Sequence, residues 1–357
     1  MISDISTRIL YVPAARPLAN AALSIEGFYY VLVWVRDTDG TVGESFLFAL
    51  DAGHARILDA AVTAMGGRIV GRDPEGIEAI WQDGWKSASF LGTSGVTVMA
   101  LAGIDGALWD IKGKRAGQSI SRLLGRIRDT VPAYASDGLW VGDATDMLRD
   151  QATAFADAGF GAMKMRLKGE AAFDLPRIAA VREAIGALDL MVDANQAMDI
   201  EGAIQLGRAL ADHDILWFEE PLPAHDLEGL ARLAKEIETP VAAGESLFTA
   251  HEFARLVDLK AAHYLMPDLQ RAGGVSEFVR IGRAAAAKGL PVSSHLFPEY
   301  SVQLMAHLPT AHSLESVSWS TPLFRETLRI EGGTAHVPDR PGWGFTFDPD
   351  AVTRYAL

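Results

Sequence analysis

Three acidic residues occur at equal spacing in the middle of this 357-residue chain. Asp193, Glu219 and Glu245 are 26 residues apart, and each ends or closely follows a short apolar run. Carboxylates brought together repel one another unless a cation lies between them. The set offers oxygen ligands only, which favours a hard divalent ion, Mg2+ first and Mn2+ as the alternative. The competing interpretation is that each acid is a solvated loop residue or a charge at a helix N-terminus.

Other charged residues occur at corresponding positions in neighbouring apolar runs. Lys164 and Arg166 are two residues apart, so on a strand both side chains face the same side. Two buried cations need anionic partners, which the acids and an anionic substrate would supply; alternatively, the pair points outward. Asp268 and His295 directly follow successive runs and are 27 residues apart. A carboxylate beside an imidazole fixes its tautomer and stabilises its charged form, although a lone histidine would more often be a packing residue.

The elements that must position these residues repeat along the chain. Eight short apolar runs alternate with Ala-, Leu-, Arg- and Glu-rich stretches of helical spacing, such as 143–158, 171–186 and 275–288. This alternation predicts parallel βαβ units, and eight in a row favour a closed barrel, whose active site lies at the C-terminal ends of the strands. The predicted strands are Val131–Ser136, Phe160–Arg166, Leu188–Asp193, Asp214–Glu219, Thr239–Gly244, Ala262–Pro267, Leu290–Ser294 and Ala311–Ser316.

The segments on either side of the predicted barrel differ from it. Tyr29–Val35 and Thr41–Phe48 flank an Asp-Thr-Asp-Gly sequence typical of a hairpin, and helical stretches follow, including Ser94–Lys114. This predicts an α+β domain over residues 1–125, followed by the barrel over 126–325. The tail, 326–357, is rich in Gly and Pro and shows no helical pattern. We expect the tail to pack back on the N-terminal domain.

Composition excludes several classes of protein. The net charge of −14 argues against a nucleic-acid binder. The absence of cysteine excludes a disulfide scaffold, a Cys-ligated metal site and a thiol nucleophile. No stretch approaches the length of an apolar membrane helix, and the first thirty residues lack the apolar region of a secretory signal. We therefore expect a soluble, cytoplasmic, acidic globular protein with no nucleic-acid or membrane partner.

The ordered set of motifs resembles the enolase superfamily, and within it the mandelate racemase subgroup. The resemblance implies an α/β fold, a modified TIM barrel (β/α)7β with an N-terminal α+β capping domain that the C-terminal tail completes, and a homo-oligomer. The matching pieces are Lys164-Met-Arg166, Val192-Asp193-Ala-Asn195, Phe218-Glu219-Glu220-Pro221, Gly244-Glu245-Ser246, Pro267-Asp268, Ser294-His295 and Leu314-Glu315-Ser316.

The resemblance also implies roles for these residues. The three equally spaced acids would bind Mg2+, and Lys164 would contact the carboxylate of a hydroxy-acid substrate. His295, paired with Asp268, would be the general acid/base, and Glu315 would hydrogen-bond a substrate carboxylate oxygen and stabilise an enediolate. The remaining positions that match the family's site are Ser136 and Asn195. Capping loops around Arg16–Ile25 and Ser45–Ala52 would close over the substrate and determine its identity.

The chain departs from the racemase pattern at Arg166, where the subgroup usually has a lysine base. A guanidinium stays protonated, so only His295, and conceivably Lys164, could accept a proton. A one-base reaction fits better, such as dehydration of an acid sugar to a 2-keto-3-deoxy acid. A racemase, epimerase or sugar-lactone cycloisomerase is the alternative, and a non-catalytic metal- and carboxylate-binding barrel is a third. Arg166 would clamp the enediolate or a distal carboxylate, or would serve as a structural counter-charge to the acids.

Overall fold

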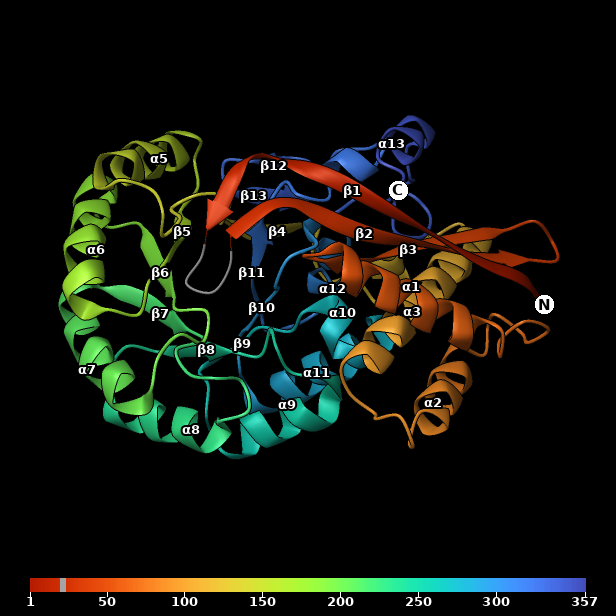
Figure 1. The fold of residues 1–357 in the computed structure, drawn as a ribbon, viewed down its shortest axis with the longest axis horizontal. Helices are drawn as coiled ribbons and strands as arrows, with labels where there is room; N and C mark the ends of the chain where they lie inside the picture. The colour runs from red at the N-terminus through yellow and green to blue at the C-terminus, as the bar shows by residue number, and fades with distance from the viewer. Residues whose placement is uncertain (20–23) are drawn as a thin grey trace.

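The computed structural model describes residues 1–19 and 24–357, so the predicted capping loop Arg16–Ile25 lies partly outside the described residues. The predicted closed barrel is confirmed (Figure 1). Its parallel strands follow one another in chain order around the barrel, and the last pairs with the first. The strands are β4 (Thr130–Ala135), β5 (Ala162–Arg166), β6 (Asp189–Asp193), β7 (Ile215–Glu219), β8 (Val241–Ala243), β9 (Tyr264–Leu265), β10 (Val292–Ser293) and β11 (Ala311–Ser316).

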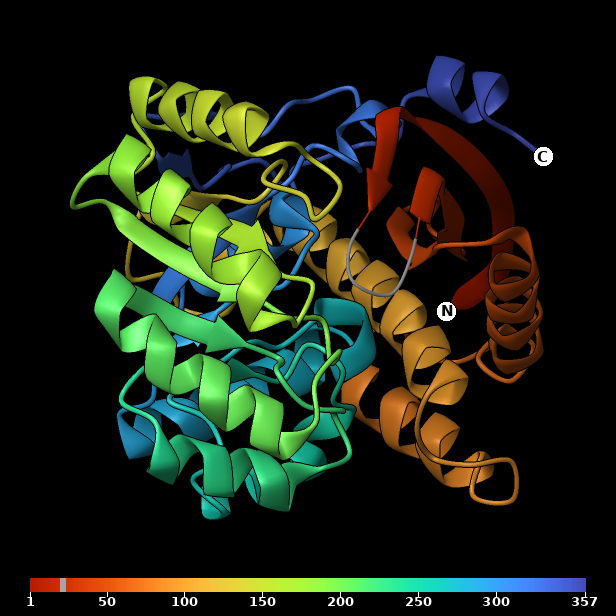
Figure 2. The same ribbon diagram turned by 60° about the vertical axis from the view of Figure 1, so that its left-hand side comes forward.

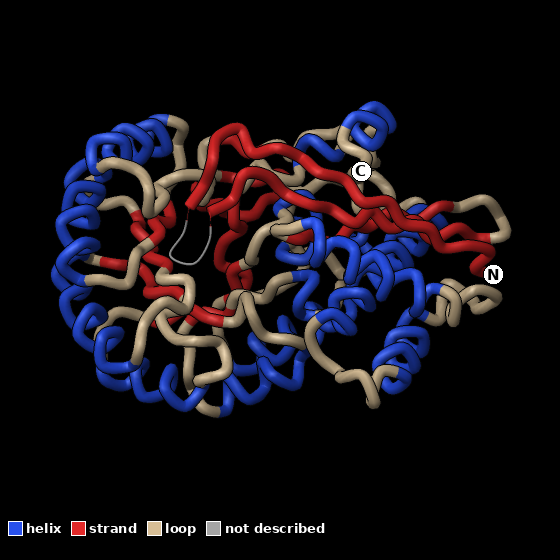
Figure 3. The backbone as a smooth tube through the Cα atoms, viewed as in Figure 1, coloured by secondary structure: helices blue, strands red, loops and turns tan. Residues whose placement is uncertain are grey.

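Helices cover the outside of the barrel (Figure 3). Each strand from β4 to β10 is followed by at least one α-helix, whereas β11 is followed by the 3-10 turn η2 (Thr321–Leu323), which gives the predicted (β/α)7β order. In the described part of the chain, no helix is both long and apolar enough to cross a lipid bilayer. The outer elements are α5 (Thr145–Asp157), α6 (Ala171–Ile185), α7 (Ile200–Leu210), η1 (Ala211–His213), α8 (Leu227–Glu236), α9 (Thr249–Asp258), α10 (Leu269–Ala272), α11 (Val275–Lys288) and α12 (Pro298–Met305).

Bulky side chains fill the interior of the barrel. Tyr134, Met191, Trp217 and Met266 form one buried cluster there. Since side chains two residues apart on a strand share a face, the residues two positions further on also face inward, one layer nearer the mouth. Those residues are polar: Ser136, Asp193, Glu219 and Asp268. The polar layer therefore lies directly above a layer of bulky, mostly apolar side chains.

The N-terminal domain is an antiparallel sheet with helices packed on it. The sheet order is β1-β2-β3, and β2 and β3 confirm the predicted hairpin. The long strand β1 was not predicted, because its mixture of polar residues and prolines lacks clear alternation. The elements are β1 (Ile2–Ala19), β2 (Ser24–Asp37), β3 (Val42–Ala49), α1 (Ala52–Gly66), α2 (Ile77–Ser87), α3 (Val96–Ala116) and α4 (Ile120–Leu123).

The tail differs in part from its prediction. It contains a helix, α13 (Pro349–Arg354), which the sequence pattern did not reveal because the helix has fewer than two turns. The hairpin of β12 (Ile330–Glu331) and β13 (Thr334–His336) pairs with β4 of the barrel, not with the N-terminal sheet. The last residues do return to the N-terminal domain, since Tyr11 N donates to Tyr355 O. The predicted domain boundaries and the homo-oligomer stay predictions.

A buried carboxylate joins the N-terminal domain to the barrel. Helix α3 lies between the two (Figure 2), and its Asp105 accepts hydrogen bonds from Ser276 N at 3.1 Å and Ser276 Oγ at 2.6 Å. These atoms belong to the first turn of α11, whose own N-cap is Gly274 and provides no side chain. Gly274 has φ +94°, and a Cβ there would lie 2.6 Å from Asp105 Oδ2. Asp105 therefore caps a helix of the other domain.

Asp105→Ala should lower the free energy of unfolding by about 1–2 kcal/mol, the usual cost of losing an N-cap. Urea unfolding of the full chain measures this. Ser276→Ala removes the partner hydroxyl but keeps the backbone donor, so its effect should be smaller, and the double variant should be less destabilised than the sum of the two. Full additivity would contradict the coupling between the domains.

Candidate active site

The polar layer at the barrel mouth places the three predicted acids side by side. Asp193 and Glu219 are the last residues of β6 and β7 and are directly paired in register. Glu245 lies two residues beyond β8, after Gly244, which has φ +130° and where an added Cβ would lie only 2.7 Å from the Phe253 ring. All three acids are buried. The equal spacing in sequence therefore corresponds to neighbouring positions at one depth of the barrel.

Lys164 occupies the space between these acids. It pairs in register with Met191, one layer below Asp193, and its long side chain reaches up into the polar layer. Its Nζ lies 2.5 Å from Glu219 Oε1 and 3.7 Å from Asp193 Oδ2. Burial alone would lower the pKa of Lys164, but the charges of Glu219 and Glu315 outweigh it and raise that pKa well above its usual value. The lysine therefore stays an ammonium ion.

Lys164 neutralises only part of the negative charge of these acids. Burial raises the pKa of Glu219 to about 8 and also raises the pKa of Asp193. Among the described residues, no three acidic or histidine side chains form a ready-made metal cage, since Glu245 Oε2 turns to His295 Nε2 at 3.2 Å. The donor set nevertheless suits a hard divalent cation, because it consists of carboxylate oxygens whose negative charge the neighbouring cations neutralise only in part.

His295 and Asp268 form the predicted pair. The two residues are joined by an isolated β-bridge, and His295 Nδ1 lies 2.7 Å from Asp268 Oδ2. The other oxygen, Asp268 Oδ1, accepts from Gln270 N and Arg271 N at 2.8 Å each, which holds the carboxylate still. Nε2 of His295 is thus directed towards the acids. Burial lowers the pKa of His295, but the charge of Glu245 and the bond to Asp268 outweigh it and raise the pKa to about 9.

Glu315 is held as an ionised acceptor. Its Oε1 accepts from Ser136 Oγ at 2.6 Å and lies 3.0 Å from Lys164 Nζ, while Oε2 accepts from Leu296 N at 2.7 Å. Burial would raise the pKa of Glu315, but Lys164, His295 and Arg166 together lower it. An ionised carboxylate cannot donate a hydrogen bond, so Glu315 acts as an acceptor for the Lys164 ammonium, the Ser136 hydroxyl and the Leu296 backbone N–H.

Arg166 is turned away from the acids towards the segment after β4. Its Nη1 donates to the carbonyls of Ser136 and Gly138, and its Nη2 donates to Ser136 Oγ at 2.9 Å. The guanidinium carbon lies 4.1 Å from the centroid of the Trp140 ring, and Nη2 is 3.9 Å from Glu315 Oε1. Arg166 is only 4% exposed. Of the two predicted roles, the geometry favours the structural counter-charge over a clamp on substrate.

Asn195 supports a neighbouring acid. It has a left-handed backbone, with φ +46°, and its backbone N and side-chain Nδ2 donate to the two oxygens of Asp193 at 2.8 and 3.0 Å. Its Oδ1 is buried and has no hydrogen-bond partner among the described residues. Asn195 therefore orients Asp193 and leaves one acceptor available.

Sequence reasoning missed several residues of this site. Trp217 belongs to the bulky layer below the acids, and its Nε1 donates to Glu219 Oε2 at 2.8 Å. Arg271 Nη1 donates to the Glu245 carbonyl at 2.9 Å. Trp140 stacks on Arg166. The position two residues before an acid on a strand could have revealed Trp217, because that position shares its inward face. Arg271 and Trp140 lie beyond strand ends, where sequence spacing does not define direction.

Family comparisons agree with this geometry. A family model described as mandelate racemase / muconate lactonizing enzyme, N-terminal domain, matches residues 4–125, and a second, described as enolase C-terminal domain-like, matches residues 147–351. The chain belongs to the mandelate racemase/muconate lactonizing enzyme family of the enolase superfamily. The resemblance stated from the motifs is thereby confirmed.

Members of this family similar to the chain include lyases and isomerases. The chain is 34% identical to L-talarate/galactarate dehydratase of Salmonella typhimurium, over 98% of this chain and 90% of that enzyme. It is 31% identical to 3,6-anhydro-alpha-L-galactonate cycloisomerase of Streptomyces coelicolor, over the whole of both. The crystal structure of the Salmonella dehydratase with Mg and L-lyxarohydroxamate matches with a TM-score of 0.94 at 34% identity, covering 100% of this chain and 93% of that one.

Arg166→Lys should lower both stability and turnover. A lysine cannot bond both carbonyls and stack on Trp140, so buried acceptors lose partners and the free energy of unfolding should fall by about 2 kcal/mol. Urea unfolding and kcat measure the two effects. Arg182→Lys is the matched control, because Arg182 also bonds backbone carbonyls, those of His213, Gly186, Leu188 and Asp214, away from the barrel mouth. It should lose stability but not kcat; equal kcat values for Arg166→Lys and the unmodified enzyme would contradict our assignment.

Proposed function

We propose that this enzyme abstracts the α-proton of a hydroxy-carboxylate in a Mg2+-dependent reaction, and that the reaction is dehydration of an acid sugar to a 2-keto-3-deoxy acid. The observation that carries the proposal is the arrangement of bases at the barrel mouth. His295 is oriented by Asp268 and directs Nε2 towards the acids, whereas Lys164 is held as an ammonium ion and Arg166 is bound to backbone carbonyls. One imidazole faces the reacting position.

Asp193, Glu219 and Glu245 are the residues that would hold Mg2+. Their burial, their shared depth and their excess negative charge support this assignment, as does the presence of Mg in the crystal structure of the Salmonella relative. When bound, the ion would act as a Lewis acid towards the substrate carboxylate and lower the energy of the enediolate charge. Asn195 would keep Asp193 oriented through its two hydrogen bonds.

Each of the remaining site residues has its own role in the proposed reaction. Lys164 binds the substrate carboxylate through its ammonium group, which Glu315 holds in place at 3.0 Å. His295 accepts a proton only as the neutral imidazole, and with Glu245 bound to a cation the charge that chiefly raises the pKa of His295 would be offset. Its Nε2 then takes the α-proton, and its Nδ1–H remains bonded to Asp268. The electron pair of the C–H bond passes into the substrate enediolate. That pair then forms the C2–C3 double bond as the 3-hydroxyl leaves, and His295 returns its proton to that hydroxyl, releasing water. The enol then rearranges to the 2-keto acid.

A cycloisomerase is the second candidate. The specific observation in its favour is the match to the Streptomyces cycloisomerase over the full length of both chains. It also needs a base on only one face of the α-carbon, unlike a racemase with two bases. Arg166 cannot serve as the second base, because a guanidinium stays protonated and its Nη atoms are already bonded to Ser136 and Gly138.

Incubation of acid sugars with the enzyme and Mg2+ in 2H2O separates the two candidates. Dehydration predicts a 2-keto-3-deoxy acid as the product. If solvent deuterium enters the α-position of the recovered acid or its isomer and no keto acid forms, the dehydratase proposal is wrong and the isomerase remains.

His295→Asn should reduce kcat by about a thousandfold, because the proton acceptor is lost while the metal ligands remain. Mg2+-dependent thermal stabilisation of the variant should be retained, which separates lost chemistry from lost structure. His54→Asn, at an exposed site on α1, is the control and should leave kcat unchanged. Substantial turnover in His295→Asn would remove this residue from the mechanism.

Chelation should abolish turnover, and Mg2+ should restore it and raise the melting temperature. An ion that binds only the folded state at about 100 times its Kd stabilises by about 2.7 kcal/mol. Glu219→Gln should lose most of this thermal shift, whereas Glu238→Gln, which changes an exposed acid, should keep it. An undiminished shift in Glu219→Gln would show that Mg2+ binds elsewhere.

A further inference from the structure

Gln270 is a buried residue that contacts both domains. It is 4% exposed and lies in α10, the single helical turn that Asp268 caps, where the barrel meets the N-terminal domain (Figure 1). Its side-chain amide reaches strand β3 of the N-terminal domain. Gln270 Oε1 accepts from Phe48 N at 2.8 Å, and Gln270 Nε2 donates to Phe46 O at 3.0 Å. One side chain of the barrel therefore holds two backbone groups that lie more than 200 residues earlier in the chain.

The amide of Gln270 bonds β3 as a neighbouring strand would. β3 is an outer strand of the sheet β1-β2-β3, and the backbone groups of residues two positions apart point to the same side of a strand. A primary amide offers one acceptor and one donor, which match Phe48 N and Phe46 O. Without this amide, a backbone donor and a backbone acceptor in a largely buried region would lose their partner, which is costly. The position of β3 therefore determines where Gln270 lies.

The backbone of the same residue holds the carboxylate that orients His295. Gln270 N donates to Asp268 Oδ1 at 2.8 Å, and Asp268 Oδ2 lies 2.7 Å from His295 Nδ1. Hydrogen bonds therefore run without interruption from β3 through Gln270 and Asp268 to the imidazole. A single helical turn has little stability of its own, so contacts with the rest of the protein decide where Gln270 N lies.

The N-terminal domain also holds the other end of α10. Trp81 of α2 donates from Nε1 to Gly273 O at 2.8 Å. Gly273 has φ +110°, and an added Cβ there would lie 3.1 Å from Val98 and 3.2 Å from the Trp81 ring, so this end packs closely against α2 and α3. On the barrel side, Arg271 of the same turn donates to Glu245 O. The place of α10 at the barrel mouth therefore depends on the docked N-terminal domain.

We propose that Gln270 is a positioning residue, which bonds β3 and Asp268 at once and so makes the orientation of the His295 imidazole depend on the N-terminal domain. This inference rests on the proposed function, in which His295 is the base. The bonded groups of β3 lie within Ser45–Ala52, the segment that we expect to cover the substrate, so the contact connects that segment with the proton acceptor. A misplacement of about 1 Å at a reacting group can cost about a hundredfold in rate.

Gln270→Met tests this role, because methionine has a similar length but offers neither polar group. With the Mg2+-loaded enzyme and an acid sugar that it dehydrates, we expect kcat to fall about 10- to 100-fold. KM and the rise in melting temperature caused by Mg2+ should change little, because Lys164 and the three acids remain in place. Gln270→Asn keeps the amide on a shorter side chain, so its kcat should lie between the two; it replaces Gln270→Met if that variant does not fold.

Gln303→Met is the matched control. Gln303 of α12 is also fully buried, and its amide also bonds backbone groups of distant segments: Oε1 accepts from Ser121 N at 3.0 Å, and Nε2 donates to Pro338 O and Trp343 O at 3.0 and 3.1 Å. Both variants should lower the melting temperature, because both leave backbone groups without partners. Only Gln270→Met should lower kcat by more than about twofold. An equal fall of kcat in the two variants would show that lost stability, and not the position of Asp268, is the cause.

Proton NMR of the Mg2+-loaded enzyme gives a measurement that needs no turnover. The His295 Nδ1 proton, which is buried and shared with the Asp268 carboxylate, should give a signal far downfield of the amide protons. Loss of the signal in His295→Asn identifies it. Gln270→Met should shift or broaden this signal, whereas Gln303→Met should leave it in place. An unchanged signal in Gln270→Met would overturn the inference.

The outcomes separate the two proposals. If acid sugars are dehydrated and Gln270→Met lowers kcat no more than Gln303→Met does, the positioning role is wrong and the proposed function stands. If Gln270→Met alone displaces the His295 signal but the unmodified enzyme dehydrates no acid sugar, the connection from β3 to the Asp268–His295 pair is supported and the proposed function is contradicted.

Discussion

Buried negative charge is the constraint on which the rest of this structure depends. Asp193, Glu219 and Glu315 are at most 2% exposed, and all three lie within 3.7 Å of one ammonium group, that of Lys164. Ions removed from water cost several kcal/mol each unless partners compensate them. One lysine compensates part of the charge, and burial still raises the pKa of Glu219 to about 8. A further cation at the barrel mouth would therefore stabilise these buried carboxylates.

The barrel satisfies this constraint through its register. Because Asp193 and Glu219 are paired across β6 and β7, their carboxylates are at one height, and the bulky layer below them keeps water out. Trp217 belongs to that layer and also donates to Glu219. The same side chain thus fills the interior and satisfies a buried oxygen, which ties the packing of the core to the geometry of the site.

Much of this arrangement could be predicted from sequence, and the limits have physical causes. Regular spacing identified the strands and the depth of the acids, since a repeated βα unit returns the chain to the same height. The direction of a long side chain is different: Lys164 and Arg166 share one face of β5, yet one reaches the acids and the other binds Ser136 and Gly138. The direction of each side chain depends on groups 28 to 55 residues away in the sequence. Strand β1 and helix α13 escaped prediction because one lacks alternation and the other is too short for a periodic signal.

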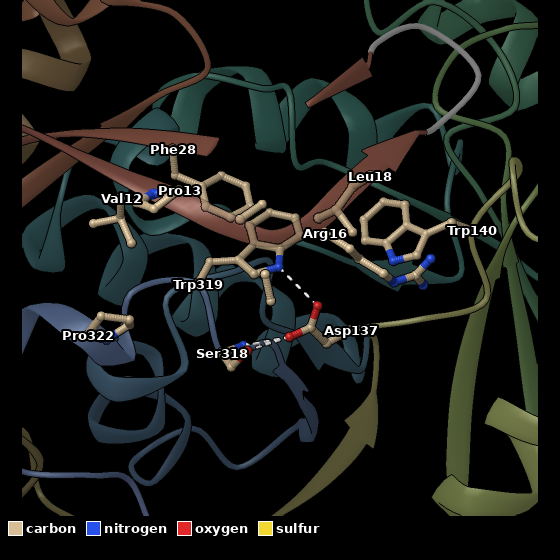
Figure 4. Close-up of a pocket in the computed structure, with 12 residues that line it drawn as sticks. Val12, Pro13, Arg16, Leu18, Phe28, Asp137, Trp140, Ser318, Trp319 and Pro322 are labelled. Carbon is tan, nitrogen blue, oxygen red and sulfur yellow. Dashed lines mark hydrogen bonds between the residues drawn. The ribbon is translucent and has the colours of Figure 1, made fainter. Parts of the chain in front are cut away.

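The segment after β4 connects Arg166 with Glu315 and with the aromatic side chains beside the barrel mouth. Arg166 holds the carbonyls of Ser136 and Gly138, and its guanidinium supports the Trp140 ring from behind. Ser136 Oγ donates to Glu315, which lies 3.0 Å from Lys164 Nζ, whereas Trp140 lines a cavity of about 420 Å³ (Figure 4). A lysine at position 166 could be a second base but could not make these contacts together. The arginine at this position therefore replaces a possible proton acceptor with contacts that fix the segment after β4, which agrees with proton transfer on one face of the α-carbon.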